Sequence, residues 1–385
     1  MILKGENIMR KKFLTIAMIV ATMAAVTACG GGKDSTNNGT GNGNQQNNEQ
    51  NGDSNTDEQE KGFVIEGNVI EEDKAYRIYD TGYFELIYEG DKEITLKGGS
   101  AGHDLLMEKE FDKLVISAGT LIDFDTLGNR SIELYIVENA ELKSGACYKN
   151  NSITKVYLNG EATEVGAATF KSCENLEEVY IGENVKSIGK EAFRDCNKLK
   201  KVVLSEGLEE IVEKAFYSCK ALEEVNLPKT LTAIGDHAFY WTLIKEVEIP
   251  SSVISLNGFQ QCTELSKVTF NEGLQVIEQD AFWNCRKITE INLPKSLTEI
   301  GYRAFADCMG ITTVQFAESS TLIKESAFSN CRALKTISFP ETLTGIEFDA
   351  FDSCISLERV TLPKSLEGKI DASAFDYLYT EVEYN

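Results

Sequence analysis

Phenylalanine recurs at a fixed interval through the second half of the chain, and this is the strongest pattern in the sequence. The series runs Phe170, Phe193, Phe216 and Phe239, followed by Phe259, Phe282, Phe305, Phe328 and Phe351. The step is 23 residues within each group and 20 residues between the groups. A period of this length is typical of a solenoid, in which each repeat forms one coil that stacks on the next.

One unit, Leu222 to Thr242, illustrates how a coil is built. Its first run, Leu222 to Leu227, alternates apolar and polar residues, which predicts a strand that Pro228 ends. Apolar residues between Leu231 and Phe239 then fill the returning arc. Because a single coil cannot close a core, we expect stacked coils to pair their strands in a parallel sheet, at about 4.8 Å per coil.

The unit has the form Leu-x-x-Val-x-Leu-Pro-x-x-Leu-x-x-Ile-Gly-x-x-Ala-Phe-x-x-Cys. Over residues 146–385 this pattern resembles the BspA-type (treponemal-type) leucine-rich repeat. The resemblance implies a curved leucine-rich-repeat solenoid with a parallel β-sheet on its concave face. It also implies exposure on a bacterial surface and adhesion to host or neighbouring-cell proteins, without catalysis, and it names no ligand.

Weaker segments precede the regular array. Leu114–Ile116 and Ile132–Ile136 alternate as strands do, so residues 110–145 are interpreted as degenerate repeats. Residues 76–96 predict two or three antiparallel strands joined by glycine-containing turns. We expect residues 63–109 to form a β-rich N-terminal cap, because an open first edge would invite aggregation.

The N-terminal residues predict export. Arg10, Lys11 and Lys12 precede an apolar run that ends in small residues, which is the layout of a secretory signal peptide. We assign it to residues 1–28, and we expect Met9 to be the true start because the charged region would then begin the chain.

Cys29 is the candidate site of lipid attachment. The junction Val26-Thr27-Ala28-Cys29-Gly30 resembles a bacterial lipobox, which implies that Cys29 becomes an acylated mature N-terminus. The alternative is an ordinary signal followed by an incidental cysteine. Residues 30–61 contain no aliphatic, aromatic or sulfur-containing side chain, so residues 29–62 are interpreted as the lipidated cysteine and a disordered tether.

The charge of the chain limits its partners. The formal net charge is −23, and both nucleic acid and anionic lipid headgroups bind clustered Lys and Arg. We therefore expect no nucleic-acid partner, and membrane contact through the lipid anchor only, on the extracellular side of the cell membrane.

A cysteine stands three residues after most of these phenylalanines, with Thr242 as the exception. The series is Cys173, Cys196, Cys219, Cys262, Cys285, Cys308, Cys331 and Cys354. Neighbouring coils are spaced by about 4.8 Å, which is more than the roughly 3.5–4.5 Å that separates the Cβ atoms of a disulfide. A straight ladder without histidine also provides no tetrahedral zinc site. We expect buried free thiols that act as small hydrophobes, and no metal or other cofactor.

Two motifs suggest chemistry outside the array. Gly98 to Gly102 matches the Gly-x-Ser-x-Gly elbow of hydrolases around Ser100, but His103 follows too closely to act as its distant partner. A glycine-rich turn before a short helix, residues 103–111, is the simpler interpretation. The run from Asp123 through Asp125 to Asn129 suggests a cation site that lacks a closing glutamate.

Candidate partner-binding residues are aromatic. Tyr157 and Tyr180 break a pattern of short polar residues on the outward side of the strands, and exposed tyrosine is favoured in binding hot spots. On the returning arc, Tyr217, Tyr240, Trp241 and Trp283 lie near the coil that is three residues short, where we expect a notch. His237 and Asp307 are expected at solvated positions.

Three functions remain open. The first is an adhesion module on the cell surface, which binds a host or bacterial surface protein. The second is a serine hydrolase centred on Ser100. The third is a structural coat protein that assembles through the ends of the solenoid, where the last run, 379–384, has no obvious cap.

Overall fold

The structure is a computed structural model, which describes residues 112–117, 131–136, 144–159, 161–318, 321–375 and 380–385, together with strands at 63–66, 85–89, 93–97, 121–122 and 141–142. All of them belong to one compact unit, residues 62–385. The signal segment, Cys29 and the tether lie outside the described residues, as do Ser100 with His103 and the 123–129 run.

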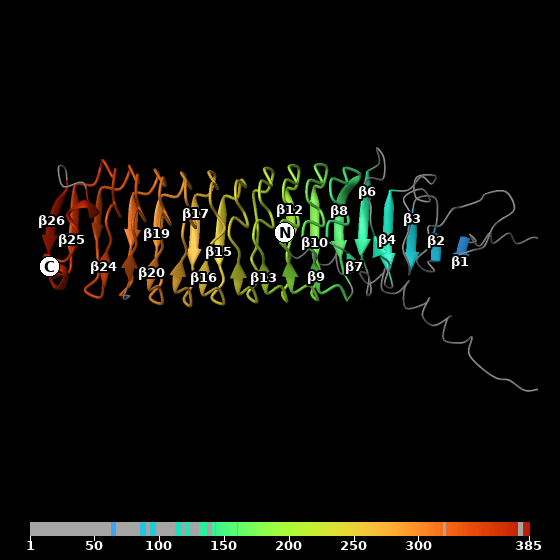
Figure 1. The fold of residues 1–385 in the computed structure, drawn as a ribbon, viewed down its shortest axis with the longest axis horizontal. Coiled ribbons are helices and arrows are strands. Elements are labelled where there is room, and N and C mark those ends of the chain that lie inside the picture. Colours follow the sequence, from blue (N-terminus) through green and yellow to red (C-terminus); the bar gives the residue numbers. More distant parts are fainter. Residues whose placement is uncertain are drawn as a thin grey trace, which may run out of the picture. The chain divides into compact units, whose positions relative to one another are not determined.

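The described chain winds through successive coils, and all but one of the coils from β4 onward carry a strand on the same side (Figure 1). We call the surface that these strands form the strand face. Its strands are β4 (Lys113–Ser117), β6 (Ile132–Ile136), β8 (Ile153–Leu158), β10 (Glu178–Ile181), β12 (Lys201–Val203), β15 (Glu246–Ile249), β17 (Lys267–Phe270), β19 (Glu290–Asn292), β21 (Thr313–Gln315), β23 (Thr336–Ser338), β25 (Arg359–Leu362) and β26 (Glu381–Tyr384).

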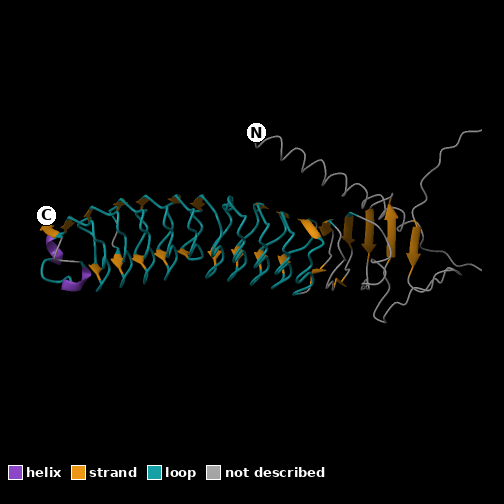
Figure 2. Ribbon diagram, turned by 90° about the horizontal axis from the view of Figure 1, so that it is seen from above, coloured by secondary structure: helices purple, strands orange, loops and turns teal. Residues whose placement is uncertain are grey.

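A second ladder of two-residue strands follows the other side of the coils, so that strands form two rows (Figure 2). It contains β9 (Glu164–Val165), β11 (Ser187–Ile188), β13 (Glu210–Ile211), β14 (Ala233–Ile234), β16 (Ser255–Leu256), β18 (Val276–Ile277), β20 (Glu299–Ile300), β22 (Leu322–Ile323) and β24 (Gly345–Ile346), with β5 (Leu121–Ile122) and β7 (Glu141–Leu142) as a separate pair. All these pairings are parallel. The sequence pattern predicts an arc at these residues and gives no sign of this ladder.

The antiparallel hairpin predicted within residues 76–96 is present, and a further strand, which was not predicted, precedes it at residues 63–66. β1 (Phe63–Glu66) pairs with β2 (Glu85–Glu89), and β2 pairs with β3 (Glu93–Lys97), both antiparallel. β3 then pairs with β4 in parallel, so the hairpin continues directly into the first coils. Near the other end, two short 3-10 helices, η1 (Lys364–Leu366) and η2 (Ala372–Ala374), replace the regular arc.

The prediction of a strand at Leu222–Leu227 is wrong, because the structure has no strand at these residues. Its inward side chains are placed as expected, since Leu222 and Val225 are buried. In the described chain, however, no backbone hydrogen bond joins residues 224–227 to either neighbouring coil. The strand face is therefore divided, with an eight-stranded sheet that ends at β12 and smaller sheets from β15 onward.

The core is a column of phenyl rings. All nine repeat phenylalanines have no exposed side-chain surface, and neighbouring rings stack with centroids 5.1–5.7 Å apart. Each contributes about 1.5–3 kcal/mol from the area it buries. Phe375, which does not follow the sequence period, extends the column by stacking on Phe351 at 5.2 Å.

The short coil does not interrupt this column. The rings of Phe239 and Phe259 stack at 5.1 Å. Gly258 has φ of +106°, and a Cβ at this position would lie 2.9 Å from the carbonyl oxygen of Gly235. The fully buried Gln260 donates hydrogen bonds to Asp236 and Asn257 at 3.1 and 2.6 Å. A glycine and a buried amide thus close the shortened arc.

Each regular arc has left-handed residues on either side of its phenylalanine. Around Phe193 these are Glu191 and Asp195, with φ of 57° and 61°. The N–H groups of Glu191, Phe193 and Asp195 all donate to carbonyl oxygens of the next coil, at 3.1, 2.8 and 2.8 Å. A left-handed non-glycine residue costs about 1–3 kcal/mol, and the hydrogen bonds between coils offset this cost.

The prediction of buried free thiols is confirmed. The nine cysteines of the described chain are free and buried. They are more than small hydrophobes, because most thiols donate to a carbonyl oxygen of the preceding coil, as Cys196 does to Phe170 at 3.1 Å. Burial raises the pKa of Cys173 and of Cys262 to about 12, so these thiols stay protonated and unreactive at neutral pH.

Candidate binding surfaces

Tyr157 and Tyr180 do not form the exposed pair that the sequence pattern predicts. Together with Tyr135 they form a stack on the strand face, with ring centroids 4.3 and 4.7 Å apart. Each ring covers its neighbours, and the three residues are only 4–9 % exposed. The tyrosines therefore form a closed layer over β6, β8 and β10, and Tyr157 and Tyr180 present no exposed ring to a partner.

Charged residues surround this tyrosine stack. Lys155 forms an ion pair with Glu133 at 2.9 Å, and the Tyr180 hydroxyl donates to Glu178. Lys201 donates to the same hydroxyl at 2.9 Å. Burial raises the pKa of Tyr157, and the Glu133 carboxylate adds to the rise. The phenols therefore remain neutral hydrogen-bonding groups.

Opposite charges alternate along the strand face as far as β12. Lys113 is in register with Glu133, Glu133 with Lys155, Lys155 with Glu178, and Glu178 with Lys201. Opposite charges on neighbouring strands are favourable partners. The next residues of this column in the repeat are Glu224 and Glu246, so the alternation ends in the coil that lacks a strand.

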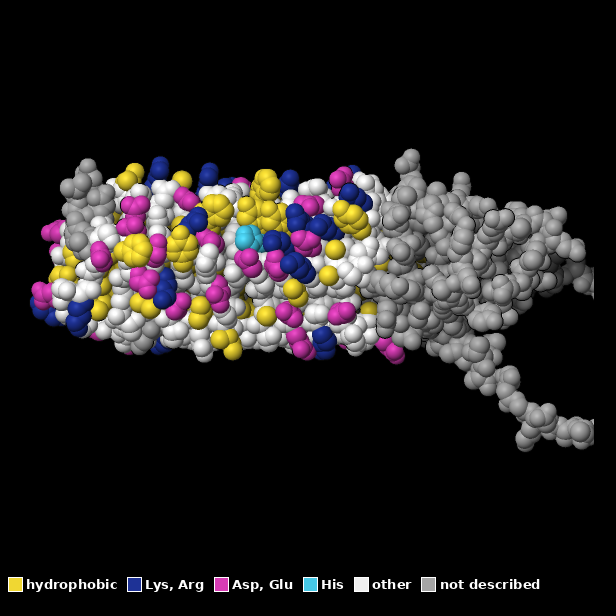
Figure 3. Space-filling view, viewed as in Figure 1, with side chains coloured by type: hydrophobic (Ala, Val, Ile, Leu, Met, Phe, Trp, Pro, Cys, Tyr) yellow, Lys and Arg dark blue, Asp and Glu magenta, His cyan; other side chains and the backbone are white. Residues whose placement is uncertain are grey.

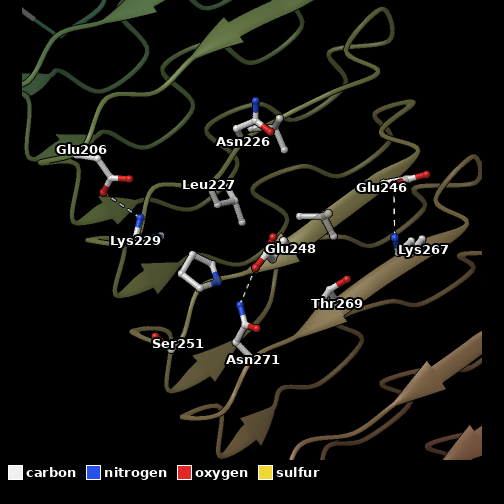
Figure 4. A pocket seen from close by; sticks show the side chains of 13 residues that line it. Glu206, Asn226, Leu227, Lys229, Glu246, Glu248, Ser251, Lys267, Thr269 and Asn271 are labelled. Carbon is white, nitrogen blue, oxygen red and sulfur yellow. Dashed lines mark hydrogen bonds and ion pairs between the residues drawn. The ribbon is translucent and has the colours of Figure 1, made fainter. Parts of the chain in front are cut away.

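A hollow opens on the strand face where the tyrosines and the pairing both end. Its volume is about 550 Å³, which lies within the roughly 300–1,000 Å³ of small-ligand pockets. Its lining comes from four successive coils and comprises Glu206, Val225, Asn226, Leu227, Lys229, Glu246, Val247, Glu248, Pro250, Ser251, Lys267, Thr269 and Asn271 (Figure 4). We call it the strand-face hollow.

The outward residues explain why the hollow forms. At the position that Tyr180 occupies in β10, the following coils carry Val203, Asn226, Glu248 and Thr269. No ring is available there to cover Val225 and Val247, which form the apolar floor. On the rim, Glu206 accepts the backbone N–H of Lys229 at 3.0 Å, and Glu248 accepts the Asn271 amide at 3.0 Å (Figure 4).

The aromatic residues of the arc form a second surface beside the short coil. Tyr217 and Tyr240 stack with centroids 4.6 Å apart, and Trp241 meets Tyr240 edge-on at 6.5 Å. Trp241 is 49 % exposed. Figure 3 shows hydrophobic side chains gathered beside the histidine on this face. We call Tyr217, Tyr240, Trp241 and Trp283 the arc aromatics.

Cationic side chains lie over several of these rings. The Arg194 guanidinium lies 4.9 Å from the Tyr217 centroid, and the Lys220 ammonium lies 4.6 Å from that of Trp241. Such contacts contribute about 0.5–1 kcal/mol at exposed sites. They hold the rings in fixed orientations, which reduces the entropy that a partner must remove on binding.

Trp283 lies beyond the short coil and has its own contacts. Its indole N–H donates to Asp307 at 2.8 Å, and the Arg303 guanidinium lies 5.1 Å from its ring centroid. Asp307 also accepts the Asn330 amide at 2.5 Å. The expectation that Asp307 is merely solvated is therefore wrong, because its carboxylate positions Trp283.

His237 is less exposed than predicted. Its side chain is 32 % exposed. Its ring lies beside the Tyr217–Tyr240 stack, with centroid distances of 6.5 and 5.1 Å to the two rings. Its Nδ1 lies 2.6 Å from a carboxylate oxygen of Asp236. His237 therefore belongs to the surface around the arc aromatics.

Two kinds of feature are not found in the described part of the chain, a metal-binding cluster of side chains and a helix that could span a membrane. No three His, Cys, Asp or Glu side chains come together there in a way that could hold a metal ion. Within the same residues, no helix is long and apolar enough to cross a membrane.

Comparison with known proteins supports the repeat assignment. The family model described as "BspA type Leucine rich repeat region (6 copies)" matches residues 141–265 and 252–381. No curated protein gives a significant match.

Several solved structures are similar to the chain. A leucine-rich cell surface protein of Faecalibacterium prausnitzii is 23 % identical, with 81 % of this chain and 96 % of that chain covered and a TM-score of 0.36. A leucine-rich repeat protein of Bacteroides ovatus is 21 % identical, with 80 % and 99 % covered and a TM-score of 0.40. The leucine-rich repeat protein of T. pallidum is 21 % identical, with 65 % and 87 % covered and a TM-score of 0.32.

The family assignment rests on the sequence match, because the two matched regions together span well over half of the chain. The repeat geometry agrees with it, since the regularly spaced Phe and Cys positions form the buried columns described above. The chain belongs to the BspA-type leucine-rich repeat family.

Proposed function

We propose that this protein is a lipid-anchored adhesion module on the bacterial surface, which binds a host or bacterial surface protein through the arc aromatics. The observation that carries the proposal is Trp241, a large aromatic residue that stays 49 % exposed while Lys220 and Tyr240 hold its ring in place. Exposed Trp and Tyr are the residues that most often dominate protein interfaces.

The repeat architecture supports a binding role in preference to catalysis. A solenoid presents an extended rigid surface, so its side chains are pre-ordered before a partner arrives. The four arc aromatics lie in three coils on either side of the short coil. Their contacts with Arg194, Lys220 and Asp307 hold the rings in place without covering Trp241.

A pull-down with the intact chain tests this role. Surface proteins of host cells and of neighbouring bacteria are passed over immobilised wild-type protein and over a Trp241→Ala/Trp283→Ala variant. The proposal expects a partner that the wild type retains and the variant loses. A Phe348→Ala variant is the matched control, because Phe348 is 46 % exposed and lies outside the arc aromatics. An identical set of partners for all three proteins would contradict the proposal.

The anchor is tested separately. The lipobox-like junction before Cys29 and the polar tether after it motivate membrane attachment. A Cys29→Ala variant expressed in a bacterial host should lose incorporation of a labelled fatty acid and leave the membrane fraction. Retention of the label in this variant would exclude Cys29 as the lipidation site.

A further inference from the structure

We propose that the strand-face hollow binds an extended peptide segment that carries arginine or lysine side chains. This site is separate from the arc aromatics, since none of them lines the hollow.

The charges at the hollow favour a cationic occupant. Glu206, Glu246 and Glu248 line it, against Lys229 and Lys267. Lys267 is already 3.9 Å from Glu246. Figure 4 shows Glu206 and Glu246 at opposite sides, with Glu248 between them. Carboxylates spaced in this way can pair with successive basic side chains of one extended chain, and Arg adds bidentate geometry.

The charge alternation of the strand face breaks at the strandless coil, which lines the hollow with Val225, Asn226 and Leu227. Glu224 follows Lys201 in the repeat and precedes Glu246, so two glutamates are neighbours where the earlier coils place a lysine beside a glutamate. Like charges on neighbouring strands are unfavourable. A basic side chain of a bound peptide would supply the positive charge that this part of the column lacks.

Hydrogen-bonding groups at the hollow suit a peptide main chain. Residues 224–227 make no backbone hydrogen bonds to neighbouring coils in the described structure. Asn226 and Thr269 add polar side chains at the outward position, over the apolar floor of Val225 and Val247. An extended segment thus finds donors, acceptors and an apolar contact within the same hollow.

Fluorescence anisotropy with the intact chain tests the proposal. The probe is a fluorescein-labelled Thr-Arg-Thr-Arg-Thr-Arg peptide, and the matched peptide has Glu in place of each Arg. We expect binding of the arginine peptide that weakens as salt is added, and no binding of the glutamate peptide. Stronger binding of the glutamate peptide would overturn the proposal.

Two variants locate the binding site. Thr269→Tyr places a ring at the column position of the tyrosine stack and fills the hollow. This variant should therefore bind the arginine peptide about tenfold or more weakly than the wild type does. Glu248→Gln removes one carboxylate from the rim and should lower the affinity for the arginine peptide by roughly threefold. Circular dichroism verifies that both variants are folded.

Two controls distinguish binding in the hollow from attraction to the acidic chain as a whole. Glu290→Gln removes an exposed carboxylate of β19 that does not line the hollow, and it should leave peptide binding unchanged. An equal loss in Glu290→Gln and Glu248→Gln would show attraction by net charge alone and overturn the site. Trp241→Ala should abolish capture of the surface partner while peptide binding persists, so the two proposals fail independently.

Discussion

The interior of the solenoid and its strand face differ in the region of the short coil and of the strandless coil that precedes it. Inside, the phenyl column continues through Phe239 and Phe259 at 5.1 Å, and the second ladder runs without a break from β9 to β24. Outside, the eight-stranded sheet ends at β12 and the tyrosine stack ends at Tyr180, and strand pairing resumes only at β15, after the strandless coil. The same region therefore keeps its core and changes its surface.

This difference indicates that stability and recognition depend on different columns of side chains. The inward positions bury Phe with Leu or Ile, and in all regular coils but that of Thr242 also Cys. A coil that loses these side chains loses its contacts with both neighbours. The outward positions carry stacked rings over β6 to β10 and short polar residues from Asn226 onward. Substitutions inside should thus affect folding, and substitutions at the hollow should affect binding.

The largest expected effect is on the pH dependence of unfolding. Burial raises the pKa of seven ladder thiols above the ordinary value of 9.0, to about 12 for Cys173 and Cys262. Unfolded thiols ionise from about pH 9, so their contribution is complete below that pH and is lost as the pH rises toward the folded pKa. The loss between pH 8 and 10 is on the order of 1 kcal/mol per thiol.

Urea titrations at pH 8 and pH 10 measure this effect. Seven thiols together would remove most of the roughly 5–15 kcal/mol that stabilises a typical domain, so the urea midpoint should fall steeply. The matched variant is Cys285→Thr, because Thr242 already occupies the same ladder position in its own coil. Between pH 8 and pH 10, the free energy of unfolding of this variant should fall by less than that of the wild type, and the difference should equal the contribution of one thiol. A free energy of unfolding that does not change with pH in the wild type would contradict the account.

The next largest effect is expected from the ring column. Phe282→Ala removes a fully buried ring that stacks on Phe259 and Phe305 at 5.7 and 5.2 Å. The free energy of unfolding should fall by about 3–5 kcal/mol. Thermal unfolding followed by circular dichroism measures it, with the exposed Glu290→Ala as control. Similar effects of both substitutions would refute the assignment of Phe282 to the core and of Glu290 to the surface.

The two halves of the strand face can be compared at one column position. Tyr157→Ala removes the central ring of the tyrosine stack and should lower the free energy of unfolding by about 2–3 kcal/mol. Thr269→Ala removes a hydroxyl and a methyl group from the strand-face hollow and should change it by less than about 0.5 kcal/mol. Equal costs in urea titrations would mean that the hollow is packed as closely as the stack.

The smallest expected effect concerns Asp307. Asp307→Ala removes the acceptor of the Trp283 indole N–H and of the Asn330 amide, which should lower the free energy of unfolding by about 1 kcal/mol. The tryptophan emission should also change, since Trp283 loses its partner. An emission spectrum identical to that of the wild type would show that Asp307 does not position Trp283.

The period of the sequence predicted the repeating core because burial requires the same side chain at each turn. Phe193, Phe282 and Phe328 are buried as expected, and the thiols are free. The parallel strands and the antiparallel N-terminal hairpin also follow from alternation of apolar and polar residues. The second ladder was missed because two residues per coil are too few to show a strand period.

The candidate site was less predictable because exposure depends on neighbouring coils. Tyr157 and Tyr180 occupy outward positions, but each ring is covered by a ring one coil away. The left-handed backbone at His237 and Trp241 has no residue signature, since glycine and asparagine are absent there. The strand-face hollow did leave a signal, the change from Tyr180 to Asn226 and Thr269 along one column.

Alkylation of the cysteines tests the central claim most directly, because nearly every coil carries its own thiol. The chain is treated with iodoacetamide before and after unfolding in guanidinium, and each site is read by peptide mass spectrometry. The account predicts that Cys173, Cys196, Cys219, Cys262, Cys285, Cys308, Cys331 and Cys354 are labelled only after unfolding. Labelling of these thiols in the folded chain, or a disulfide between any two, would contradict it.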